Sequence, residues 1–143
     1  VHEAVSVDFF EGVFNLECKI YEDIGVLDYC KCHNIQFVCY QPLRRGRTAN
    51  RYYSLLLELS KKYQKTQNQI ILNWIWKEKQ LFPLVKSTNI DRISENIHSL
   101  NFDMSREDYE KMNQFRSNEF DSVVIDWNGA GGVSIDQLAN QFE

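Results

Sequence analysis

Basic and hydroxyl side chains gather in the segment LVKSTNIDRISEN, residues 84–96. Lys86 offers a compact positive charge, and Ser87 and Thr88 offer hydroxyl groups. Arg92, six residues after the lysine, adds a planar guanidinium that can bind two oxygens at once. These are the groups with which proteins bind phosphate, so their types and spacing predict an anion pocket. The alternative is that the two basic residues are solvated surface charges without a ligand.

A second group of reactive side chains lies in CKCH, residues 30–33, which together with Cys18 could supply metal ligands. A Cys-x-Cys pair on a helix directs its thiols apart, unlike the Cys-x2-Cys pair of common zinc sites. We therefore expect no metal, and we place Cys30 in the apolar stripe of a helix and Cys39 in a buried strand. The four cysteines lack disulfide-like spacing, so reduced thiols are expected.

The elements that must position these side chains alternate between strands and helices. Residues 35–40, IQFVCY, are β-branched, aromatic and nearly all apolar, which is typical of a strand covered on both faces. Strands and helices in alternation indicate right-handed βαβ units and a parallel sheet. The patterns predict strands at 35–40 and 81–85, and helices at 21–34, 51–65, 89–100 and 105–116, with a further helix from Thr66.

Helix starts and buried faces can also be predicted. Thr66 with Gln69 and Ser105 with Asp108 have the spacing of helix N-terminal caps. The segment from residue 117 onward, with its WNGAGG stretch, reads as irregular structure. One face of the helix at 51–65 is expected to carry Tyr52, Leu55, Leu56, Leu59 and Tyr63.

The predicted anion pocket lies where α/β proteins bind their ligands. Segment 84–96 joins the predicted strand at 81–85 to the predicted helix at 89–100. Ligands of α/β folds bind at the carboxyl ends of parallel strands, where helix N-termini offer backbone N–H groups to an anion. The placement favours a phosphate ligand for this segment.

Composition excludes several classes of partner. The chain has 143 residues, of which 43% are hydrophobic and 25% charged, which is typical of one globular domain with a core. The sequence contains no apolar run long enough to cross a membrane and no signal-peptide pattern, so we expect a cytoplasmic protein without a membrane partner. A net charge of -4 disfavours nucleic acid as a partner.

The segment VKSTNIDRISEN resembles the adenosine-phosphate site of the aldo-keto reductases, whose pattern is met here by Lys86, Ser87, Arg92, Glu95 and Asn96. GVLDYCKCHNIQFVCYQPLRRG is similar to that family's sixth helix, seventh strand and following loop. YQKTQNQIILNWI resembles its characteristic helix pair, and SREDYEKMNQF its last barrel-packing helix. The resemblance covers roughly residues 14–116.

This resemblance implies a (β/α)8 TIM barrel, of which residues 1–143 would be the C-terminal portion with about the last three βα units and an irregular tail at 117–143. It implies NADP(H) as cofactor and a small carbonyl substrate, because the family reduces aldehydes or ketones to alcohols. A non-catalytic regulatory or scaffold protein that retains the barrel is the alternative.

Roles of individual residues follow from the resemblance by position. Lys86, Ser87 and Arg92 would hold the 2′-phosphate of the cofactor. Glu95 and Asn96 would meet the adenine.

Three further positions follow in the same way. Tyr40 would stack on the nicotinamide, although from the residues alone it reads as a core tyrosine. Gln41 and Leu43 would line the path of the pyrophosphate. The family's Asn-Gln pair, which grips the nicotinamide amide, falls on Phe10 and Glu11 when the spacing is counted back from the later motifs.

The family's catalytic Asp, Tyr, Lys and His belong to the first half of the barrel, and no Tyr and Lys of this chain match those motifs. We therefore expect no catalytic residue in this chain alone, and we expect it to need the N-terminal half of the barrel or to self-associate.

For the amide-binding pair, a shift in register would let Asn15 stand in.

Overall fold

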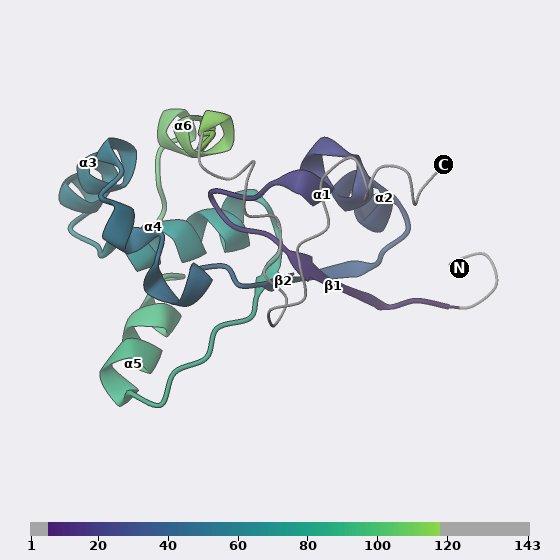
Figure 1. The fold of residues 1–143 in the computed structure, drawn as a ribbon, viewed down its shortest axis with the longest axis horizontal. Coiled ribbons are helices and arrows are strands. Elements are labelled where there is room, and N and C mark those ends of the chain that lie inside the picture. Colours follow the sequence, from purple (N-terminus) through teal and green to yellow (C-terminus); the bar gives the residue numbers. More distant parts are fainter. Residues whose placement is uncertain (1–5, 118–143) are drawn as a thin grey trace, which may run out of the picture.

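Three parallel strands form the centre of the structure, a computed structural model that describes residues 6–117 (Figure 1). They are β1 (Phe9–Val13), β2 (Gln36–Tyr40) and β3 (Phe82–Pro83), in the order β1-β2-β3. The register pairs Val13 with Tyr40 and Cys39 with Pro83, so the carboxyl ends of the strands lie together. The predicted parallel sheet and the strand at 35–40 are confirmed, while the expected tail at 117–143 lies almost wholly outside the described residues.

The third strand is shorter than the predicted segment 81–85. Pro83 has no N–H to donate to a neighbouring strand, which limits the ladder at this edge. The Leu84 N–H still donates to the Cys39 carbonyl at 2.9 Å, after which the chain leaves the sheet. Leu84 and Val85 are exposed and lie beyond the strand, so the predicted strand at 81–85 is too long.

The single helix predicted at 21–34 is two helices, α1 (Ile20–Asp23) and α2 (Val26–Cys32). Gly25 separates them with a φ of 82°, a left-handed conformation that glycine adopts without steric cost. The predicted burial of Cys30 is confirmed.

Two helices follow β2 and its loop. Helix α3 (Ser54–Tyr63) begins after Tyr52, which is exposed, so the prediction that Tyr52 lies on one face of this helix is wrong. Helix α4 (Gln67–Asn73) continues into a π-helical turn (Trp74–Glu78). The capping box that starts α4 is confirmed, since the Thr66 Oγ1 accepts from the Gln69 N–H at 3.2 Å.

The last two helices are α5 (Ile90–His98) and α6 (Arg106–Gln114). Ser105 caps α6 as predicted, because its Oγ accepts from the Asp108 N–H at 3.2 Å. Helices α1 and α2 stand beside the strands, α3, α4 and α6 form a group, and α5 packs against α4 at the end of the segment that follows β3 (Figure 1). None of the helices formed by residues 6–117 is both long and apolar enough to span a membrane.

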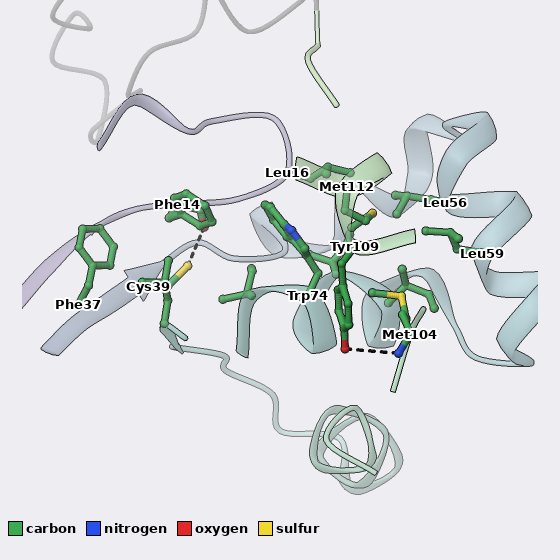
Figure 2. Packing of buried hydrophobic residues seen from close by; sticks show 14 of the residues in the cluster. Phe14, Leu16, Phe37, Cys39, Leu56, Leu59, Trp74, Met104, Tyr109 and Met112 are labelled. Carbon is green, nitrogen blue, oxygen red and sulfur yellow. Dashed lines mark hydrogen bonds between the residues drawn. The ribbon is translucent and has the colours of Figure 1, made fainter. Parts of the chain in front are cut away.

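The hydrophobic core lies between the sheet and this group of helices (Figure 2). The rings of Phe14 and Trp74 stack at 5.5 Å, and the Trp74 Nε1 donates to the Asn113 Oδ1 at 2.9 Å. Cys39 is fully buried as predicted, and its Sγ donates to the Phe14 carbonyl at 2.7 Å. The core thereby fixes the end of β2, from which the loop beyond it departs.

Candidate functional site

A pocket of about 750 Å³ opens at the carboxyl end of β2. Its walls come from the loop after β2, the start of α4, the segment after β3 and helix α5. All eight residues predicted for the site line it: Tyr40, Gln41, Leu43, Lys86, Ser87, Arg92, Glu95 and Asn96. Eight more residues contribute, which the sequence patterns did not predict: Pro42, Arg45, Gly46, Ala49, Asn50, Asn68, Leu84 and Val85.

One end of the pocket carries positive charge. Lys86 and Arg92 are both exposed, and neither forms an ion pair with a carboxylate of residues 6–117. Ser87 orders the turn between them, because its Oγ accepts from the Asn89 N–H at 3.1 Å. Thr88 is exposed but does not line the pocket, so only one of the two predicted hydroxyl groups reaches it.

The start of α5 is held in shape by its cap. The Asn89 Oδ1 accepts from the Arg92 backbone N–H at 3.0 Å, which fixes the first helical turn below the pocket. Arg92 therefore projects from a defined helical position. Two unpaired cations and a hydroxyl around a helix start form a site that favours an anion.

The other side of the pocket is polar and tied together. The Thr66 Oγ1 donates to the Glu95 Oε1 at 2.6 Å, and the Gln69 Nε2 donates to the Glu95 carbonyl at 3.0 Å. These bonds join the start of α4 to α5. Asn68 lies between the two donors in sequence and lines the same pocket as Asn96.

The loop after β2 has an unusual backbone. Gln41, Arg44 and Arg45 have φ values of 52°, 48° and 58°, in the left-handed region that residues other than glycine rarely adopt. Such conformations persist where the surroundings determine them, and they concentrate at ligand sites. Arg45 lines the pocket and adds a third cation to its walls. Its position in RRGR, directly after the predicted Leu43, was the available signal in the sequence.

A buried carboxylate anchors this loop. The Glu17 side chain is 1% exposed and forms ion pairs with Arg44 and Arg51. The Tyr53 hydroxyl donates to the Glu17 Oε1 at 3.0 Å. Glu17 therefore connects the turn after β1 to both ends of the loop, a role that sequence patterns did not reveal.

Asn15, not Phe10 or Glu11, lies at the pocket end of β1. The register places Phe10 and Glu11 opposite Phe37 and Val38, whereas Val13 pairs with Tyr40 at the carboxyl end of β2. The Asn15 Nδ2 donates to the Gln41 carbonyl at 3.3 Å, while its Oδ1 accepts from two backbone N–H groups. Asn15 thus supports the left-handed turn at Gln41.

Known proteins resemble this chain along most of its described length. The model of the aldo/keto reductase family matches residues 2–117. Aldose reductase C of Dictyostelium discoideum is 31% identical over 91 residues, which are 64% of this chain and 28% of that protein. The NADPH-dependent alpha-keto amide reductase of Saccharomyces cerevisiae is 30% identical over 110 residues, which are 73% of this chain and 35% of that protein.

Solved structures agree with these matches. A Bombyx mori aldo-keto reductase in complex with NADP aligns with a TM-score of 0.65 and 27% identity, over 85% of this chain and 40% of that one. An aldo-keto reductase from a deep-sea metagenome library aligns with a TM-score of 0.71 and 22% identity, over 82% of this chain and 43% of that one. The chain therefore spans less than half of the length of these relatives.

Proposed function

Because this chain belongs to the aldo/keto reductase family, we propose that it binds NADP(H) and serves the reduction of aldehydes or ketones to alcohols. Its strands and helices are part of a (β/α)8 barrel. The observation that carries the proposal is the meeting of Lys86, Ser87 and Arg92 in one pocket with no ion-pair partner for either cation among residues 6–117.

The residues of the pocket fit the adenosine 2′-phosphate of this cofactor. Lys86 and Arg92 supply charge-assisted donors and Ser87 a hydroxyl, which complement a dianion. Glu95 and Asn96 would face the adenine. A pocket for a neutral ligand would leave the two cations without a role.

The remaining predicted residues would hold the other half of the cofactor. Tyr40, at the end of β2, would stack on the nicotinamide, and Gln41 and Leu43 would line the pyrophosphate path. The bound nicotinamide supplies the hydride for carbonyl reduction, and the protein contributes its orientation and its electrostatic surroundings.

Reduction also needs an acid that protonates the carbonyl oxygen. In this family the acid is a tyrosine beside a lysine, and we assign neither role to a residue of this chain. We propose instead that further βα units supply the catalytic groups and close the barrel, from an N-terminal half or a second polypeptide.

An open apolar surface supports this part of the proposal. Helix α5 exposes an apolar face, and β3 exposes Phe82 at the edge of the sheet. Exposed apolar faces and open strand edges are usually covered in stable proteins. The residues of this surface are Phe82, Leu84, Val85, Ile90, Ile93, Ile97 and Leu100.

Calorimetric titration with NADPH and NADH at two salt concentrations tests the cofactor. Two charge-assisted hydrogen bonds of about 1.5 kcal/mol each favour NADPH by about 3 kcal/mol, or roughly a hundredfold. Both cations are exposed, so the preference should shrink as salt is raised from about 0.05 to 0.5 M. Equal affinity for the two cofactors at low salt would contradict the proposal.

A further inference from the structure

One polar side chain of the pocket lacks the partner that its burial demands. Asn68 lines the same pocket as Glu95 and Asn96. Its Oδ1 is shielded from solvent, yet it accepts no hydrogen bond from any of residues 6–117. Buried amide oxygens are nearly always paired, and a turn of the side chain toward the pocket would let this oxygen accept from a ligand.

The neighbours of Asn68 are committed to other contacts. The Thr66 hydroxyl and the Gln69 amide both donate to Glu95, and the Gln69 Oε1 accepts from the Thr66 N–H at 3.1 Å. These bonds fix the first turn of α4 against α5 on either side of Asn68. The carboxamide of Asn68 is thereby held beside the part of the pocket assigned to the adenine.

The chemistry of a carboxamide matches one edge of adenine. Adenine presents its 6-amino donor next to its N7 acceptor, and an asparagine oxygen and nitrogen can pair with both at once. The terminal torsion of asparagine is broad, so the carboxamide can turn either atom toward the pocket at low cost. A hypoxanthine base carries an oxygen in place of the amino group, so both atoms of this edge are acceptors and the carboxamide can pair with only one of them.

We propose that Asn68 recognises the adenine base of the dinucleotide, its Oδ1 accepting from the 6-amino group and its Nδ2 donating to N7. This role rests on the proposed function, because it requires the cofactor in the pocket. It makes Asn68 a specificity-determining residue for the base, whereas Lys86 and Arg92 discriminate at the 2′-phosphate.

The test compares NADPH with reduced nicotinamide hypoxanthine dinucleotide phosphate by calorimetry. The wild-type protein should prefer the adenine cofactor by about tenfold, which corresponds to ~1.4 kcal/mol. Asn68→Leu, which keeps the volume and removes both polar atoms, should remove the part of this preference that Asn68 contributes, while Glu95 and Asn96 still face the base. Asn68→Ala provides a second variant if the leucine side chain disturbs folding, which thermal unfolding would reveal.

Gln67 offers a matched control one residue away. Its Oε1 is also shielded and unpaired among residues 6–117, but Gln67 does not line the pocket. Gln67→Leu should therefore keep the tenfold preference for adenine. Asn68→Leu should also keep the preference for NADPH over NADH, because both carry adenine and differ only at the 2′-phosphate.

The outcomes separate this inference from the proposed function. If Asn68→Leu binds the adenine and hypoxanthine cofactors with the wild-type ratio, the inference is wrong although NADPH binding stands. A wild-type protein that binds both bases equally overturns it as well. If the wild-type protein binds neither NADPH nor NADH, the proposed function fails and this role fails with it.

Discussion

Glu17→Gln tests whether one buried carboxylate holds the loop that lines the pocket. Glu17 accepts from the Tyr53 hydroxyl at 3.0 Å and pairs with Arg44 and with Arg51, whose Nε lies 3.3 Å from the Glu17 Oε1. Glutamine has the same shape and keeps an acceptor for Tyr53, but it removes the charge that both arginines face.

The size of the effect follows from burial. The side chains of Glu17 and Arg44 are 1% and 13% exposed, so water cannot replace the lost partner of Arg44. Arg51 is 33% exposed and is resolvated more easily. Breaking a buried ion pair costs about 3–5 kcal/mol. Because the hydrogen bond from Tyr53 remains, we expect the free energy of unfolding to fall by about 3 kcal/mol. The melting temperature should fall by roughly 10 °C.

Urea unfolding followed by circular dichroism measures this loss. Asp103→Asn is the matched control, because Asp103 pairs with Lys77 at 2.6 Å but its side chain is 81% exposed. That surface pair should contribute under about 0.5 kcal/mol. If the free energy of unfolding of Glu17→Gln lies within about 0.5 kcal/mol of the wild-type value, Glu17 contributes no more than a surface ion pair and the predicted role of its buried charge is wrong. Because Arg45 and Gly46 line the pocket, Glu17→Gln should also weaken NADPH and NADH to the same degree.

Three further predictions concern other parts of the chain. Burial raises the pKa of the Asp108 carboxyl, but hydrogen bonds from Lys62 and Tyr63 outweigh it and lower the pKa from 3.8 to about 2. The stability that this shift contributes is present above pH 3.8 and is lost as the pH falls through 2. Asp108→Asn should therefore lower the free energy of unfolding by about 1–2 kcal/mol at pH 7, after allowance for solvent screening, and by little near pH 2. Urea unfolding at both pH values measures this difference, and an equal loss at the two would contradict it. The four cysteines should be reduced and free of metal, and stoichiometric zinc that survives chelator and is lost in Cys30→Ser would disprove this. The chain alone should not oxidise NADPH with 4-nitrobenzaldehyde, because we assign no general acid to it and such an acid contributes about 10²–10⁴ in rate. Turnover that is proportional to the amount of protein and absent from a mock preparation would overturn this prediction.

Local sequence signals predicted the parts of the fold that depend on local physics. The apolar run at 35–40 formed β2, and the Thr66 and Ser105 caps started their helices at the predicted residues. The caps depend on contacts three residues apart, and β2 was recognisable from the residue types of one short apolar run. Gly25 was visible in the sequence, but its left-handed φ of 82°, which separates α1 from α2, was not.

The site residues also fall into two groups, those close together in the sequence and those brought together only by folding. Lys86 and Arg92 stand within one segment, so their spacing was sufficient to predict an anion pocket. Asn68 and Glu17 act across 27 or more residues, since the pocket joins Asn68 to Glu95 and an ion pair joins Glu17 to Arg44. No local pattern contains such pairings, because they are set by how the strands and helices pack.

Preference for NADPH over NADH depends most directly on Arg92 as a ligand of the 2′-phosphate. Arg92→Ala should weaken NADPH about tenfold, since an exposed charge-assisted hydrogen bond contributes near 1.5 kcal/mol, and should leave NADH unchanged. Arg106→Ala is the control, because it removes an equal charge from α6, where Arg106 pairs with Glu78 at 2.9 Å outside the pocket. Calorimetric titration of both cofactors into these variants tests this role. The predicted result is a selective loss of NADPH affinity in Arg92→Ala alone. An equal loss of NADH and NADPH affinity would contradict the assignment of Arg92 to the 2′-phosphate.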